Sequence, residues 1–163
     1  MSDQLSHHEA ATVQIRRAEP SQAEMIAAIV RAAFTTVAQE IDMDIPPLHE
    51  TADDVRATFA AGDVTLIAVI DGIAVGTVRG ETLRNGDIMV RRLGVLPTHR
   101  GHGIARQLMV ALEDAYPDAK RFELFTGAMA SGPLRLYESL GYKLMKQEGD
   151  VAVPLVYLEK CIN

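Results

Sequence analysis

The segment that decides the fold reads Pro97-Thr98-His99-Arg100-Gly101-His102-Gly103-Ile104-Ala105. It follows an apolar run, residues 88–96, and precedes residues that repeat at helical spacing. Glycine lets backbone N–H groups face a ligand with no Cβ in between, and the first turn of a helix leaves such groups unpaired beside the positive end of its dipole. Arg100 adds a cationic side chain there. The segment therefore predicts a turn that binds a pyrophosphate.

Strand and helix patterns flank this turn on both sides. Alternating or β-rich runs predict strands at 13–16, 65–70, 73–78, 87–96, 121–125, 142–146 and 155–160, and apolar repeats predict helices at 21–37, 51–62, 103–115 and 133–140. Asp71-Gly72 is a hairpin signal, and the helix at 103–115 crosses over between two strands that are then parallel. We expect an α/β (α+β) domain with a mixed, mostly antiparallel sheet of about six to seven strands and about four helices.

Composition indicates one globular domain. The chain has 163 residues, 48% of them hydrophobic and 23% charged, which suits a single core. We expect residues 1–12 to be a flexible N-terminus and residues 13–163 to form the domain. The net charge of −6 argues against a nucleic-acid partner, because such proteins usually present a basic face, and is compatible with a cationic acceptor.

Several classes of site and location are disfavoured by residue usage. The single cysteine, Cys161, excludes an intrachain disulfide and a cysteine-rich metal site, and the five histidines lack a paired metal-binding spacing. The first residues carry no apolar signal-peptide run, and no apolar stretch approaches a membrane span. We therefore expect a cytoplasmic protein with no metal and no membrane partner.

Gly94, inside the strand before the turn, has two interpretations. It is either a small residue packed under a helix, or a β-bulge that turns backbone groups away from the neighbouring strand. A bulge there would free backbone groups of Leu93 and Val95 for an extended ligand.

At these residues the chain resembles the GNAT superfamily of N-acetyltransferases. Arg100-Gly101-His102-Gly103-Ile104-Ala105 matches the family's Arg/Gln-x-x-Gly-x-Gly/Ala coenzyme A motif, and Leu136-Tyr137-Glu138-Ser139-Leu140-Gly141-Tyr142 resembles its Tyr-Glu-x-x-Gly-Phe/Tyr segment. The resemblance implies a splayed central pair of parallel strands with acetyl-CoA between them. It also implies direct acetyl transfer to an amine of a small molecule or protein. Homodimers are common in the family, although no feature of this sequence fixes an interface.

The resemblance also assigns residues. Backbone groups of Leu93 and Val95 would hold the pantetheine arm, and the amides of Arg100, Gly101, His102, Gly103, Ile104 and Ala105 would bind the pyrophosphate. The Val95 N–H would stabilise the charge that develops on the thioester oxygen. Tyr137 would act as general acid toward the coenzyme sulfur.

The acceptor side is less defined by the sequence. A general base is expected, and Glu81 is the first candidate for it; Glu50 is a second candidate and a candidate substrate contact. For both carboxylates a solvated surface position is the alternative. The family's usual Asn before the tyrosine is replaced by Ala130, and Pro133 also departs from the pattern, so Ser131 is a candidate for the missing coenzyme contact.

Two other functions stay open at this point. A dinucleotide-binding Rossmann module also uses a glycine turn, but Arg106 stands at its third glycine position and the preceding strands form a meander. A catalytically silent acyl-CoA-binding regulatory domain would keep the turn and lack acceptor chemistry. The presence of Tyr137 favours an enzyme.

Overall fold

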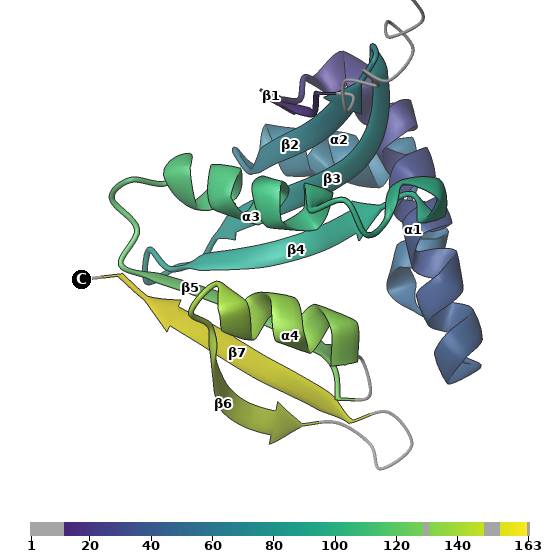
Figure 1. Ribbon diagram of the computed structural model, residues 1–163. Helices are drawn as coiled ribbons and strands as arrows, with labels where there is room; N and C mark the ends of the chain where they lie inside the picture. Colours follow the sequence, from purple (N-terminus) through teal and green to yellow (C-terminus); the bar gives the residue numbers. More distant parts are fainter. Residues whose placement is uncertain (1–11, 129–130, 149–153, 163) are drawn as a thin grey trace, which may run out of the picture.

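The computed structural model describes residues 12–128, 131–148 and 154–162, which build a seven-stranded sheet between two layers of helices (Figure 1). The strands are β1 (Gln14–Arg17), β2 (Val64–Ile70), β3 (Ile73–Thr82), β4 (Ile88–Val95), β5 (Arg121–Gly127), β6 (Lys143–Glu148) and β7 (Leu155–Cys161). Their order is β1-β2-β3-β4-β5-β7-β6, and every neighbouring pair is antiparallel except β4 and β5. The expected mixed sheet with a central parallel pair is confirmed. The N-terminal residues 1–11, expected to be flexible, lie outside the described residues.

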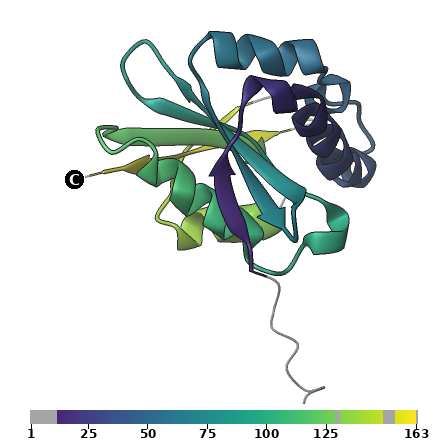
Figure 2. The same ribbon diagram turned by 90° about the horizontal axis from the view of Figure 1, so that it is seen from above.

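Helices cover both faces of this sheet (Figure 2). They are α1 (Ala23–Ile41), α2 (Ala52–Ala60), α3 (Ile104–Asp114) and α4 (Ser131–Ser139), with 3-10 turns η2 (Pro20–Gln22), η3 (Pro46–His49) and η4 (Pro97–His99). Ile26 and Val30 of α1 and Val55 of α2 form one buried cluster with β2, whereas Leu108 and Leu112 of α3 belong to a second cluster. Strand β2 is thus buried on both sides, as its apolar run requires.

Local signals explain most element boundaries. Asp71 and Gly72 both have positive φ, 51° and 79°, as a tight β2–β3 hairpin needs. Thr51 caps α2 in a reciprocal box with Asp54. Before α1, Glu19 and Gln22 form a similar box around the 3-10 turn that Pro20 opens.

The central strand β4 contains a bulge two residues before Gly94. Thr77 lies opposite Gly94 but Arg79 lies opposite Arg91, so Arg92 and Leu93 together face one residue of β3. Arg92 has a left-handed φ of 55°. Gly94 itself is buried, and a Cβ there would meet the Ala33 Cβ of α1 at 2.8 Å. Both interpretations of this strand are therefore partly right: Gly94 packs under a helix, and the bulge is centred on Arg92.

Gly94→Ala is expected to lower the free energy of unfolding by about 1–3 kcal/mol, because a methyl group forces α1 away from the sheet. Adding Ala33→Gly to this variant removes the opposing methyl group. Glycine within a helix lowers stability by itself, but the double variant should lose less stability than the sum of the two single losses. Urea denaturation of the single and double variants measures this coupling. Gly127→Ala on β5 is the control, since a Cβ there meets nothing within 4 Å. Strictly additive losses at 33 and 94 would contradict the steric account.

Candidate active site

The parallel strands β4 and β5 separate soon after they meet. They pair only at Ile88 with Phe122 and at Met89 with Glu123, while β4 continues along β3 as far as Val95. The edge of β4 that faces β5 is therefore unpaired beyond Met89. Helices α3 and α4 lie on one face, on either side of this splay, and both begin at the end where the strands diverge (Figure 1).

Val95 directs its N–H into the splay. The Leu96 N–H donates to the Val75 carbonyl at 2.8 Å, on the β3 side. Because N–H groups of successive strand residues point to opposite edges, the Val95 N–H faces the unpaired edge. Leu93 lies in the irregular part of the strand, so its contact with the pantetheine arm stays a prediction.

The glycine turn leads into α3 with its backbone uncovered. Gly101 and Gly103 have φ of 81° and 76°, and Gly103 is the N-cap of the helix. A Cβ at either glycine would meet nothing within 4 Å. His102 is exposed, and Ile104 is buried under the turn, which anchors the helix start to the core. The first N–H groups of α3, Ala105 included, have no partner within the helix and are free to meet an anion.

Arg100 holds the turn rather than extending from it. Its Nη2 donates to the Ala33 carbonyl of α1 at 2.6 Å, and its Nε donates to the Val95 carbonyl at 3.2 Å. The guanidinium therefore ties the turn to α1 and to the end of β4. In this arrangement the backbone amide of Arg100, rather than its side chain, stays the candidate contact for an anion.

Tyr137 lies on α4 and is almost fully buried, at 8% exposure. Its ring meets Tyr142 edge-on, with centroids 6.1 Å apart. Burial raises the pKa of the Tyr137 phenol to about 12. Among the described residues its hydroxyl has no hydrogen-bond partner. The phenol is consequently a protonated donor at neutral pH that is not committed to another group.

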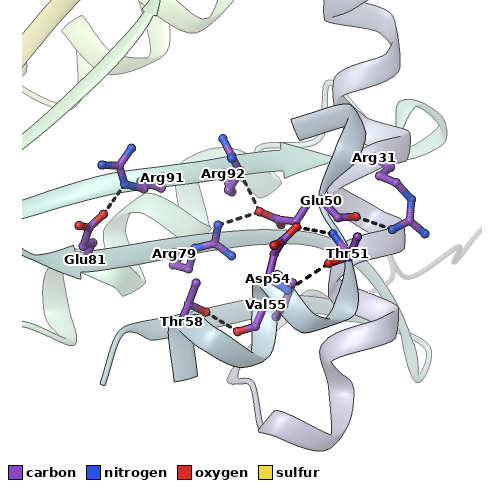
Figure 3. A network of polar contacts seen from close by, with 10 residues as sticks. All are labelled: Arg31, Glu50, Thr51, Asp54, Val55, Thr58, Arg79, Glu81, Arg91 and Arg92. Carbon is purple, nitrogen blue, oxygen red and sulfur yellow. Dashed lines mark hydrogen bonds and ion pairs between the residues drawn. The ribbon is translucent and has the colours of Figure 1, made fainter. Parts of the chain in front are cut away.

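Glu50 stands between η3 and α2, beneath the bulge (Figure 3). Its Oε1 accepts from Arg79 Nη2 and from Arg92 Nε, each at 3.0 Å, and its carbonyl accepts from Arg31 Nη1 at 2.6 Å. The Glu50 side chain is only 4% exposed, and its Oε2 is buried without a partner. A solvated position for Glu50 is therefore wrong, because two arginines hold this carboxylate inside. No sequence spacing indicates that 50, 79 and 92 meet.

The structure does not bring Glu81 close to Val95. Glu81 is opposite Met89, and Val95 is opposite Gly76, so the two positions are five residue steps apart along β3, about 17 Å at strand spacing. Glu81 instead forms an ion pair with Arg91. Direct proton transfer from an amine held at Val95 to Glu81 is out of reach.

A family model for the acetyltransferase (GNAT) domain matches residues 61–144, just over half of the chain. The chain belongs to the GNAT acetyltransferase family. The match runs from the end of α2 to the start of β6 and so includes the splay, the turn and Tyr137.

Solved structures of several acetyltransferases share this fold. The PaiA N-acetyltransferase of Thermoplasma acidophilum, solved with coenzyme A, superposes with a TM-score of 0.78 at 15% identity over 93% of this chain and 99% of that one. The YncA protein of Salmonella typhimurium, solved with acetyl-CoA, gives 0.76 at 19% identity over 94% and 95%. A ribosomal-protein-alanine N-acetyltransferase from Brucella melitensis gives 0.74 at 18% identity over 91% and 99%. These TM-scores show a shared fold.

The departures from the GNAT motif lie at the start of α4. Ala130 is outside the described residues, α4 begins at Ser131, and Pro133 occupies the first turn, where proline is well tolerated. A coenzyme contact from Ser131 stays a prediction.

A shallow depression between the end of α1 and η3 is lined by Thr35, Ala38, Gln39, Asp42, Met43, Asp44 and Leu48. Helix α1 extends to Ile41, four residues further than predicted, and so forms one wall of this depression. Within the described ranges no three His, Cys, Asp or Glu side chains gather as metal ligands, and no helix is long and apolar enough to cross a bilayer.

Proposed function

We propose that this protein transfers an acetyl group from acetyl-CoA to a primary amine. The observation that carries the proposal is the unpaired edge of β4, with the Val95 N–H directed into the splay and an open glycine turn at its end. Membership of the GNAT family and the coenzyme bound in two relatives of the same fold support acetyl-CoA as the donor.

The residues present fit the coenzyme. Backbone groups of Leu93 and Val95 would pair with the amide-rich pantetheine arm as a further strand would. The amides of 100–105 would hold the pyrophosphate, with the open space at Gly101 and Gly103 leaving room for phosphate oxygens. When bound, the coenzyme supplies an activated acyl thioester.

Two groups of this chain would assist the transfer. The Val95 N–H donates a hydrogen bond to the carbonyl oxygen as negative charge develops on it. Tyr137 donates its proton to the departing sulfur, and the raised pKa keeps that proton in place at neutral pH. No protein nucleophile is needed for direct transfer to the amine.

The amine must lose a proton before or during attack. Since Glu81 lies about 17 Å along the sheet from Val95, it would act only through bridging water. We propose that the proton leaves to solvent. The exposed, single Cys161 is typical of a reducing compartment, and we propose a cytoplasmic enzyme.

Incubation with acetyl-CoA and a pooled amine panel tests the proposal. We expect a mass increase of about 42 Da on at least one amine, together with release of free thiol. Heat-denatured protein and omission of acetyl-CoA are the controls. A folded protein that binds acetyl-CoA yet acetylates no amine in the panel would instead be the catalytically silent regulatory domain.

A further inference from the structure

We propose that Arg92 binds a carboxylate of the acceptor, so that the amine acetylated here is an amino acid rather than a simple amine or polyamine. This inference rests on the proposed function and names the substrate class of the same site. It depends on the conformation of Arg92, on what holds its side chain, and on its position beside Val95.

The backbone places Arg92 in an unfavourable conformation. Its φ of 55° lies in the left-handed region, which a long side chain rarely adopts. The residue occupies the bulge of β4, so its side chain leaves the regular alternation of the strand. An arginine at a position whose backbone suits glycine or asparagine points to a use for the side chain.

Glu50 fixes one side of the Arg92 guanidinium and leaves the other side available. Only Nε of Arg92 is bonded, to Glu50 Oε1 at 3.0 Å, and within the described residues neither Nη atom has a hydrogen-bond partner. The side chain is 24% exposed and its end points away from Glu50 (Figure 3). Arg79, 6% exposed, holds the same Glu50 oxygen from the other side. Arg92 is thus a preoriented fork with two free nitrogens, the geometry that binds a carboxylate through two parallel hydrogen bonds.

Arg92 lies close to the expected reaction centre. The bulge lies opposite Val78, and Val95 lies opposite Gly76. The bulge and Val95 are therefore about 7 Å apart along the strand, the length of two residues of β3. An amino group held at Val95 and a carboxylate at Arg92 therefore suit one small molecule. The neighbouring Arg91 lacks this freedom, because it pairs with Glu81 and lies over the Phe125 ring, 6.0 Å from its centroid.

The local charge favours an anion although the chain is acidic. One buried carboxylate, Glu50, is shared between Arg79 and Arg92, which leaves a positive excess at the bulge. A further carboxylate, Asp54, accepts from the Thr51 N–H, and its pKa is lowered by that cap first and by Arg79 and Arg92 to a lesser degree. The net charge of −6 acts at long range, whereas contact specificity depends on the groups that face the ligand.

Matched acceptor pairs that differ only in the carboxylate test the proposal. The pairs are L-leucine with 3-methylbutylamine, L-phenylalanine with 2-phenylethylamine, and β-alanine with ethylamine, with spermidine as a polycation. We expect kcat/KM to favour the acid in at least one pair by about 10-fold or more, the range of a charge-assisted bidentate contact. Arg92→Gln should bring that ratio toward one, Arg92→Lys should restore it only in part, and Arg91→Gln should keep it.

A binding measurement separates this inference from the proposed function. Calorimetry with N-acetyl-L-leucine and N-acetyl-3-methylbutylamine, each in the presence of coenzyme A, needs no turnover. We expect the acid to bind more tightly to the wild type and to lose that advantage in Arg92→Gln. Absence of any acetylation would refute the proposed function alone. Equal or stronger use and binding of the decarboxylated partners, or a preference for acids that survives in Arg92→Gln, would overturn the role of Arg92.

Discussion

Gly103→Val is expected to weaken coenzyme A binding by about 100-fold or more in a protein that still folds. Gly103 is the N-cap of α3 at φ of 76°, and its surroundings are open, so a valine side chain would occupy the space where the turn meets phosphate. The loss corresponds to about two hydrogen bonds to a charged group at roughly 1.5–3 kcal/mol each. Isothermal titration calorimetry with coenzyme A measures it.

Gly86→Val is the matched control for the backbone cost of this change. Gly86 has φ of 87°, and a Cβ there also meets nothing within 4 Å, but it lies in the β3–β4 turn away from the splay. Both variants should lose comparable stability, because valine at positive φ is strained in each. Only Gly103→Val should lose affinity. Equal affinities in the two folded variants would remove the turn from the coenzyme site.

Local patterns in the sequence were sufficient to predict the sheet and the turn. The hairpin at Asp71-Gly72, the cap at Thr51 and the apolar face of α3 each act over a few residues, so their effect can be inferred from neighbouring positions. The parallel pairing of β4 and β5 follows from the crossover helix between them.

The bulge could not be placed so well. The bulge was expected at Gly94 because glycine is common in bulges. The extra residue is instead Arg92. Gly94 is small because Ala33 of α1 packs against it. Sequence gave no sign of a contact between residues 33 and 94, which depends on how α1 crosses the sheet. An arginine at positive φ contradicts its own propensity and is held by tertiary contacts.

The burial of Glu50 escaped prediction for the same reason. A carboxylate after a proline-rich segment ordinarily faces solvent, and only the register of β3 against the bulged β4 brings Arg79 and Arg92 to it. The opposite error was made for Glu81. Its position in the sequence suggested a general base, whereas the pairing of β3 with β4 brings it next to Arg91, with which it forms an ion pair. Acceptor-side residues come from separate elements, so their meeting is decided by tertiary structure.

Tyr137→Phe is expected to lower kcat by about 10²–10⁴-fold, the usual range for loss of a general acid, with coenzyme affinity nearly unchanged. The hydroxyl has no partner among the described residues, so its removal should leave stability almost intact. Tyr142→Phe is the control, since Tyr142 is buried beside Tyr137 but its hydroxyl donates to Glu113 Oε2 at 3.1 Å. That variant should lose stability with little change in kcat.

The pH profile adds an independent readout of the same proton. A raised pKa means that the neutral phenol persists as pH rises, so between pH 7 and 10 the wild-type kcat should show no falling limb from Tyr137; a fall is expected only toward about pH 12. The amine loses its own proton over the same range, so the rate at subsaturating amine should rise with pH. A kcat that falls with an apparent pKa near 10 in wild type and not in Tyr137→Phe would show the phenol in contact with water. Full activity of Tyr137→Phe across this pH range would mean that solvent, and not Tyr137, protonates the departing thiolate.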